Sequence, residues 1–188
     1  MSAIQLPLDL GHRPALGRDD FLVAPSNEVA VAWIDRWPDW PGPALALFGT
    51  PGSGKSHLCQ VWLKASDGLA IDPDDVARKQ PPELLGDARA CALDGIEDRL
   101  EGRPEVERSL LHLYNMLAER GGHLLLAGRR APAAWPVRLA DLRSRLTAAT
   151  AVGLEAPDDA LIGAVLVKLF ADRQLRVAPE VVRFLTAR

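Results

Sequence analysis

The chain has 188 residues and a mass of 20.4 kDa, with 48% hydrophobic residues, 25% charged residues and a net charge of -3 at neutral pH. This length and composition fit one globular domain, or one domain with a small appendage, and exclude wholesale disorder. The pI near 5.8 excludes a domain that holds nucleic acid mainly by bulk positive charge, but it does not exclude a local basic patch.

The sequence shows no pattern typical of export or of a membrane span. Asp9 interrupts the apolar stretch that a signal peptide needs, and no run approaches the ~20 apolar residues of a transmembrane helix. Cys59 and Cys91 lie in apolar stretches without a zinc-binding pattern, so we interpret them as reduced core residues. We therefore expect a cytoplasmic protein with no membrane contact.

The first distinctive stretch is "QLPLDL" at residues 5–10, which places Leu6, Leu8 and Leu10 on alternate positions. Alternation is typical of a half-buried strand, but Pro7 restricts that interpretation to a sheet edge. The other interpretation is an extended, proline-stiffened peptide that offers its side chains to the pockets of a partner. These residues alone leave both interpretations open.

The next stretch, "PSNEVAVAWIDRW", predicts a short helix. Ser26 or Asn27 can cap its start. Val29, Trp33 and Trp37 repeat along one side of it.

Short apolar runs and helical patterns then alternate along the chain. Strands are predicted at residues 44–48, 68–72, 89–94, 123–128 and 149–154. Helices are predicted at residues 55–65, from residue 105 to the glycines at 121 and 122, and at residues 137–146. The second of these helices places Val106, Leu110, Leu113 and Leu117 on one face. Strands separated by helices predict an α/β fold with a parallel sheet covered on both sides.

Beyond residue 157 the pattern is helical without a strand. We interpret residues 156–188 as the start of a small helical lid, the remainder of which lies outside this chain. The expected organisation is an extended peptide at residues 1–19, an α/β domain at residues 20–155 and this partial lid.

The turn after the first core strand reads "GTPGSGKS" and fits the phosphate-loop pattern G-x-x-x-x-G-K-[ST] between a strand and a helix. Its glycines let backbone N–H groups and the helix N-terminus surround a phosphate. The lysine then reaches the β and γ phosphates, and the serine hydroxyl holds Mg2+. We expect the nucleotide phosphates to be bound by Gly49, Thr50, Pro51, Gly52, Ser53, Gly54, Lys55 and Ser56.

A phosphate-loop protein also needs an acidic residue at the end of a core strand to orient the Mg2+, and Asp94 ends the run "ACALD". One predicted strand lies between the two in the chain, as is typical of the ATPase branch in which an extra strand separates them. A simple ATPase of that branch usually carries a second carboxylate next, where this chain has Gly95. Glu97 and Asp98 are near in sequence but do not stand directly after Asp94, where the second carboxylate is expected. The pattern therefore favours nucleotide binding over turnover.

Two further features of the sequence can each be interpreted in two ways. His57 follows the phosphate loop and either touches the nucleotide or lies on the helix surface, which we favour. Asp72, Asp74 and Asp75 form either a solvated acidic loop, which we favour, or a second metal site.

The phosphate loop, Asp94 and the helical tail together resemble the DnaA-type branch of the AAA+ ATPases, from about residue 20 to the end. "DDFLVAPSNEVA" and "GSGKSHL" are similar to that branch's stretch before the phosphate loop and to the loop itself. "LYNMLAERGGHLLLAGRRAP" resembles its helix and sensor strand, and "LADLRSRL" its arginine-finger segment. The resemblance implies a three-layer P-loop AAA+ fold with a parallel five-stranded sheet and the start of a C-terminal helical lid.

The resemblance also implies ligands. ADP or ATP would bind with Mg2+ held by Ser56 and Asp94, and the adenine would lie near Leu22, Val23 and Asn27.

Three arginines are singled out by the same resemblance. Arg145 in "SRL" would be the arginine finger that reaches a neighbour's nucleotide, with Arg143 as the weaker candidate. A buried ion pair or a helix-end charge is the alternative interpretation of Arg145. Arg129 stands where a polar or acidic sensor residue is expected.

Within the branch, the chain is similar to short regulatory members that carry a Q-L-x-L-x-L peptide for the DNA polymerase sliding clamp. Gln5, Leu6, Leu8 and Leu10 match this peptide, the glutamine for a small polar pocket and the leucines for an apolar groove. The resemblance implies a nucleotide-switch regulator that promotes hydrolysis of DnaA-bound ATP and prevents re-initiation of replication. Its partners would be the clamp and DnaA, with DNA reached through the clamp; a homodimer stays open.

Three alternatives remain at the level of the sequence. A helicase-loader-like ATPase would show DNA-stimulated turnover of its own, against which Gly95 speaks. An interaction module with a vestigial phosphate loop is disfavoured by the intact "GSGKS". A fragment of DnaA is disfavoured because residues 5–10 leave no room for the N-terminal domain of DnaA.

Overall fold

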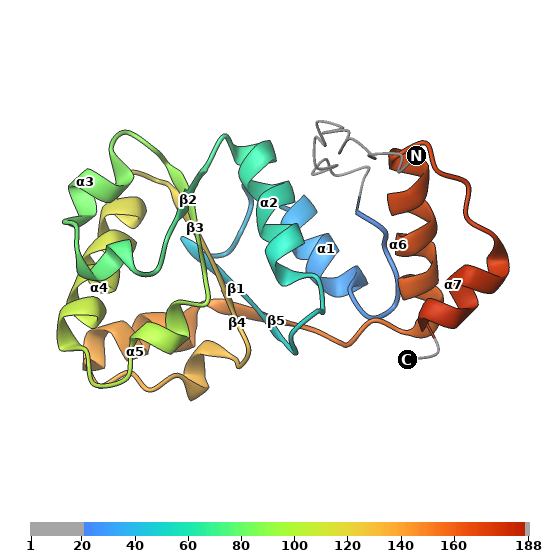
Figure 1. Ribbon diagram of the computed structural model, residues 1–188. Helices are drawn as coiled ribbons and strands as arrows, with labels where there is room; N and C mark the ends of the chain where they lie inside the picture. The colour runs from blue at the N-terminus through green and yellow to red at the C-terminus, as the bar shows by residue number, and fades with distance from the viewer. Residues whose placement is uncertain (1–20, 187–188) are drawn as a thin grey trace, which may run out of the picture.

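A computed structural model describes residues 21–186 of the chain (Figure 1). Its strands are β1 Ala44–Gly49, β2 Leu69–Ile71, β3 Ala90–Asp94, β4 His123–Gly128 and β5 Thr150–Leu154. They form one sheet in the order β2-β3-β4-β1-β5, in which every neighbouring pair is parallel. The predicted α/β fold with a parallel five-stranded sheet is confirmed.

Seven α-helices are described within residues 21–186, namely α1 Glu28–Asp35, α2 Lys55–Ser66, α3 Pro81–Leu85, α4 Pro104–Glu119, α5 Ala140–Ala148, α6 Asp159–Asp172 and α7 Pro179–Thr186. Short 3-10 helices add η2 Asp75–Ala77, η3 Ile96–Arg99 and η4 Pro132–Ala134. Helices α1 and α2 cover one face of the sheet and α3, α4 and α5 the other, whereas α6 and α7 lie beyond α1 (Figure 1). Within these residues, no helix has the length and apolar character that crossing a membrane requires.

The strands are apolar on both sides because helices cover both faces of the sheet. In β1, Leu45 and Leu47 belong to the core cluster under α1 and α2, whereas Ala44 and Ala46 belong to the cluster under α4. The predicted apolar face of α4 is confirmed, since its four residues at 106, 110, 113 and 117 have 0% exposure. Two apolar cores, one on each face, therefore hold the sheet between its layers of helices.

The buried face of α1 is not the side along which Val29, Trp33 and Trp37 repeat. Val29 is 56% exposed, and the buried side of the helix carries Ala30, Val31 and Ile34 instead. Positions 30, 31 and 34 also follow helical spacing, and the small side chain of Ala30 lets the helix lie close to the sheet. The wide tryptophans at 33 and 37 pack only partly against this core.

Two features of the chain between β1 and β4 were not evident from the pattern. Helix α3 has five residues and begins at Pro81, which is too short to show helical periodicity. The strand that separates β1 from β3 in the sheet is β4, which comes later in the chain, and not β2, which lies between them in sequence. This order places the ends of β1 and β3 on either side of β4.

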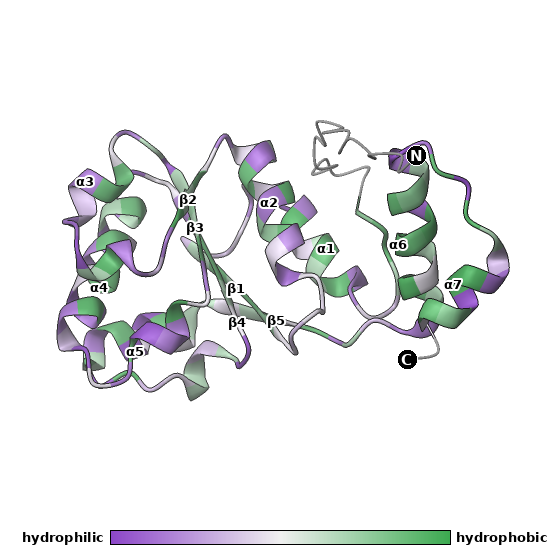
Figure 2. Cartoon of the chain, viewed as in Figure 1, coloured by the Kyte–Doolittle hydropathy of each residue, from purple (hydrophilic) through white to green (hydrophobic). Residues whose placement is uncertain are grey.

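Helices α6 and α7 form a separate pair. The Asp158 carboxylate caps α6 by accepting a hydrogen bond of 2.7 Å from the Leu161 N–H. Neither helix has a fully buried residue, and α6 carries apolar residues around much of its circumference (Figure 2). The rigid core therefore lies in the sheet and its covering helices.

Candidate functional site

The phosphate loop connects β1 to α2 as predicted. Gly49 must be a glycine because a Cβ there would lie 2.2 Å from the Leu154 carbonyl oxygen of the neighbouring strand. Gly54, the N-cap residue of α2, has a φ of 97°, a conformation that favours glycine. The loop therefore turns sharply enough to aim the N-terminus of α2, with its free N–H groups, at the space above the loop.

Lys55 is the first residue of α2, and its ammonium group is held over the loop. The Nζ atom donates to the carbonyl oxygens of Gly49 and Thr50, both at 2.8 Å, and to the Ser53 Oγ at 3.3 Å. These acceptors place the positive charge at the concave side of the turn, within reach of the groups a bound phosphate would contact. A phosphate bound at this turn would have to replace these carbonyl partners of the ammonium.

Ser56 and Asp94 meet across the sheet, although 38 positions separate them in the chain. The Ser56 hydroxyl donates a hydrogen bond to the Asp94 carboxylate. Both side chains are exposed, so the pair faces solvent next to the phosphate loop. One hydroxyl and one carboxylate side by side fit the donor set of an Mg2+ ion that also takes phosphate oxygens and water.

The two carboxylates that follow Asp94 in η3 each have partners at the end of β4. Gly95 has a φ of 77° and turns the chain into η3. Glu97 is only 4% exposed, and its carboxylate accepts hydrogen bonds from the backbone N–H groups of Arg129 and Arg130 at 2.6 and 3.3 Å. Asp98 pairs with the Arg129 guanidinium at 3.4 Å.

Through these contacts Arg129, at the end of β4, is bound to Glu97 and Asp98 of η3. Arg129, at the position where a sensor residue is expected, is an exposed partner of Asp98 and a backbone donor to Glu97. Glu97 therefore ties η3, directly after Asp94, to the end of β4.

The chain before α1 lies against the phosphate loop. Phe21 is buried, its ring lies edge to face with the His57 ring at 5.1 Å between centroids, and a Cβ on Gly54 would lie 3.7 Å from it. His57 is half-buried, and its Nε2 atom has no hydrogen-bond partner within residues 21–186. His57 therefore packs beneath the incoming chain, and its contact with nucleotide stays a prediction.

The buried side chain of Asn27 holds the segment before α1 by two hydrogen bonds to its backbone. Its side chain is buried and accepts a bond of 3.0 Å from the Ala24 N–H while donating one of 3.0 Å to the Leu22 carbonyl oxygen. Asn27 is the N-cap residue of α1 but makes no side-chain capping bond, because its amide serves the preceding turn. Leu22 lines a groove of about 760 Å³ with α6 and α7, whereas Val23 is 53% exposed.

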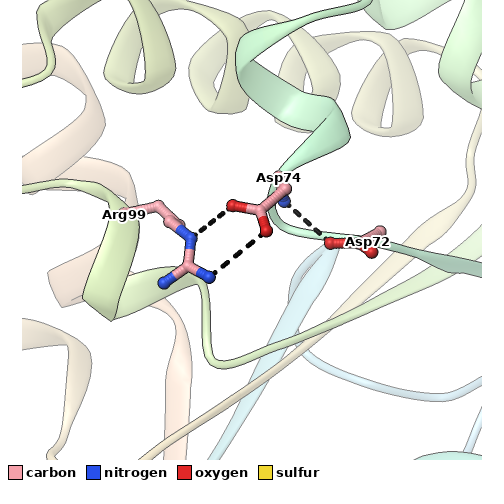
Figure 3. A network of polar contacts seen from close by, with 3 residues as sticks. All are labelled: Asp72, Asp74 and Arg99. Carbon is pink, nitrogen blue, oxygen red and sulfur yellow. Dashed lines mark hydrogen bonds and ion pairs between the residues drawn. The ribbon is translucent and has the colours of Figure 1, made fainter.

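The acidic loop after β2 is bound to η3 (Figure 3). Arg99 donates to both carboxylate oxygens of Asp74, at 2.5 and 3.3 Å, and this hydrogen bonding lowers the pKa of Asp74. The Asp72 carboxylate accepts from the Asp74 N–H at 2.9 Å, and Asp75 pairs with Lys79. No group of three or more His, Cys, Asp or Glu side chains within residues 21–186 has the arrangement of a metal site.

The two candidate arginines of α5 differ in their contacts. Arg143 donates through Nε and Nη2 to the Val137 carbonyl oxygen, so its guanidinium is bound to the chain before the helix. Arg145 is exposed, and its guanidinium lies 5.2 Å from the centroid of the Tyr114 ring on α4. The alternative of a buried ion pair does not fit the exposed Arg145, whereas the alternative of a helix-end charge does fit, because Arg145 lies in the last turn of α5.

The two cysteines are buried and free. Burial raises the pKa of Cys91 to about 12 and raises that of Cys59 as well, with a further increase from the Asp94 charge. Thiols held in the protonated form react slowly with oxidants, in agreement with their interpretation as core residues.

No family model matches the chain. The chromosomal replication initiator protein DnaA of Caulobacter sp. strain K31 is 32% identical over 196 residues, which cover 90% of this chain and 40% of that DnaA. Domain III of the Thermotoga maritima replication initiation protein DnaA matches the fold with a TM-score of 0.79 at 19% identity, covering 93% of this chain and 81% of that one. The chain is thus similar to DnaA over 90% of its length and has the fold of DnaA domain III, and we refer to it as a DnaA-like domain.

A structure of the replication initiator DnaA bound to AMPPCP and single-stranded DNA matches the DnaA-like domain with a TM-score of 0.77 at 18% identity, covering 93% of this chain and 60% of that one. The DnaA-like domain spans about two fifths of the length of the DnaA relatives that it matches. These comparisons therefore support the fold and the family resemblance, and not the activity of a whole DnaA.

The structure brings part of the predicted site together. The phosphate loop, Ser56, Asp94, His57 and the segment with Leu22 and Asn27 converge at one end of the sheet. The peptide with Gln5, Leu6, Leu8 and Leu10 lies outside the described residues. Sequence analysis missed the contacts of Phe21 with His57 and of Tyr114 with Arg145, because the partners in each contact are distant in the chain.

Proposed function

We propose that this DnaA-like domain binds ADP or ATP with Mg2+ and uses the nucleotide as a switch. The convergence of the phosphate loop, the Lys55 ammonium and the Ser56–Asp94 pair supports binding. A bound adenine would contact the segment that precedes α1 and lies beside the phosphate loop, at Leu22, Val23 and Asn27. Gly95 and the occupied carboxylate of Glu97 support weak or absent turnover by the domain itself.

Lys55→Ala is expected to weaken ADP binding about 10- to 100-fold, because a charge-assisted hydrogen bond to phosphate is lost. Titration with a fluorescent ADP analogue measures this change. Lys64→Ala, which removes an exposed lysine from the far end of α2, is the matched control and should bind ADP as the unaltered protein does. Equal affinity of the Lys55 variant in a folded protein would remove the phosphate loop from nucleotide binding.

We further propose that the protein is a regulator of replication initiation of the Hda type, the DnaA-related regulatory inactivator. In this function Arg145 enters the nucleotide site of an ATP-bound DnaA and promotes hydrolysis of that ATP, which prevents re-initiation. The observation that carries the proposal is the exposure of Arg145 on α5, on the opposite face of the sheet from α2. An arginine placed there is available to a neighbouring molecule.

The peptide at residues 5–10 would tether the protein to the DNA polymerase sliding clamp. Gln5, Leu6, Leu8 and Leu10 supply a polar anchor and three alternate apolar anchors, the pattern of an extended peptide that binds in side-chain pockets. The clamp then raises the local concentration of the regulator near DNA without a direct DNA contact. Hydrolysis of DnaA-bound ATP in the presence of the DNA-loaded clamp tests this function.

The second candidate function is a helicase-loader-like ATPase, which the intact phosphate loop favours. It predicts ATP turnover by the protein alone that single-stranded DNA accelerates. We expect phosphate release by the isolated protein to stay near the background rate with and without DNA, since the described residues place no free carboxylate directly after Asp94. Strong DNA-stimulated turnover would favour the loader over the regulator.

A further inference from the structure

Two side chains of α4, Glu107 and Tyr114, contact α5 or the residue directly before it. Glu107 and Tyr114 are seven positions apart, which is two helical turns, so they lie on the same side of α4. The apolar face of α4 packs in the core cluster that also holds Leu142 and Leu146 of α5. Helix α4 is therefore the support on which α5 rests.

Glu107 holds the start of α5. It is only 2% exposed, and its carboxylate accepts from the Arg138 N–H at 3.1 and 3.0 Å and from the Leu139 N–H at 2.6 Å. Leu139 is the N-cap residue of α5 and offers no side-chain oxygen for capping. The carboxylate of Glu107 binds the N–H groups of the two residues that precede α5, not those of its first turn, and so fixes the chain where the helix begins. Its negative charge also complements the positive end of the α5 dipole.

Tyr114 holds the end of the same helix. It is 7% exposed, and its ring lies under the Arg145 guanidinium at 5.2 Å. A cation at this distance from a tyrosine ring is attracted by the negative face of the ring. Buried Leu142 and Leu146 anchor the inner side of α5, which leaves Arg145 at the rim of the α4–α5 contact.

Arg143 cannot share this role in the observed arrangement. Its guanidinium donates twice to the Val137 carbonyl oxygen and so fixes the chain that leads into α5. Arg145 is thus the arginine of this helix that is both exposed and seated on an aromatic ring.

We propose that Glu107 and Tyr114 are positioning residues for Arg145, Glu107 by fixing the axis of α5 and Tyr114 by restricting the guanidinium to one orientation. Restricting an exposed arginine before contact lowers the entropy lost when it enters a partner's site. The inference rests on the proposed function, because it gives Arg145 the role of an arginine finger.

The contact itself is tested by NMR on the full chain without any partner. The ring current of Tyr114 should shift the δ-methylene protons of Arg145 upfield, Tyr114→Phe should keep this shift, and Tyr114→Leu should abolish it. A shift that is absent from the unaltered protein, or that survives Tyr114→Leu, would overturn the contact.

The function of the contact is tested by DnaA-bound ATP hydrolysis at saturating protein. We expect Tyr114→Leu to lower the stimulated rate constant about two- to five-fold, as for loss of an exposed cation–π contact, with Tyr114→Phe close to the unaltered protein. In an Arg145→Ala background, Tyr114→Leu should have no further effect. A stimulated rate unchanged by Tyr114→Leu, despite loss of the NMR shift, would overturn the positioning role.

Glu107 is tested in parallel with Glu107→Gln, which keeps one carbonyl acceptor, and Glu107→Asp, which keeps the charge. Both variants are compared only if their thermal melting shows a folded protein. The stimulated rate constant should fall in each while ADP affinity stays constant, because α5 lies on the opposite face of the sheet from α2. Unchanged stimulation in both folded variants would remove Glu107 from the role. If the unaltered protein fails to stimulate DnaA while the NMR shift is present, the proposed function fails and the contact stands.

Discussion

Arg145→Ala is expected to abolish stimulation of DnaA-bound ATP hydrolysis, with a loss on the order of 10^3-fold or more in the stimulated rate constant. An arginine finger acts by stabilising charge on the transferring phosphoryl group, and alanine supplies no replacement for that charge. Arg145 is exposed, with its guanidinium over the Tyr114 ring, so its removal should leave the fold intact. Single-turnover hydrolysis of ATP preloaded on DnaA measures the effect.

Arg143→Ala is the matched variant for this experiment. It removes a guanidinium two positions away on the same helix, but one that is bound to the Val137 carbonyl oxygen. We expect most of the stimulation to survive in the folded Arg143 variant. Full activity of the Arg145 variant together with an inactive Arg143 variant would reverse the assignment of the two arginines.

The second large effect is expected from the N-terminal peptide. Replacing Gln5, Leu6 and Leu8 with alanine should weaken binding to the sliding clamp on the order of 10^2-fold or more, because two leucine anchors and one polar anchor are lost together. Isothermal calorimetry with the purified clamp measures the dissociation constant. Leu16→Ala, a leucine from the same N-terminal segment but outside the peptide, is the control and should bind as the unaltered protein does.

The same triple variant should keep its affinity for ADP, since residues 5–10 are not among the groups of the phosphate loop. This separates loss of the tether from loss of the fold. Clamp binding that is absent from the unaltered protein, or that tolerates all three substitutions, would remove the tether from the proposed function and favour the helicase-loader alternative.

Those parts of the fold that depend on neighbouring residues were predictable from the sequence. The strands are short apolar runs because both faces of the sheet are covered, and the phosphate loop is a local pattern between β1 and α2. The face of α4 was equally clear, since four large apolar residues repeat with helical spacing. At α1 the repeat of Val29, Trp33 and Trp37 indicated a helix but not its buried face, which carries Ala30, Val31 and Ile34.

Apart from the Ser56–Asp94 pair, which the phosphate-loop motif implied, those parts of the site that depend on distant partners could not be predicted. Glu97 and Glu107 look like surface residues in sequence, yet each carboxylate is buried because it accepts backbone N–H groups from a segment about 30 positions later. The Phe21–His57 contact likewise joins two segments that only the folded chain brings together. Such contacts follow no local period, so pattern analysis has no signal for them.

The measurement that tests the central claim most directly is single-turnover hydrolysis of radiolabelled ATP bound to DnaA, with this protein and the sliding clamp loaded on DNA. Reactions without the clamp, without this protein and with the Arg145 variant complete the set. Our account predicts fast hydrolysis only when the clamp and the unaltered protein are both present. A rate that is the same with and without this protein would contradict the account.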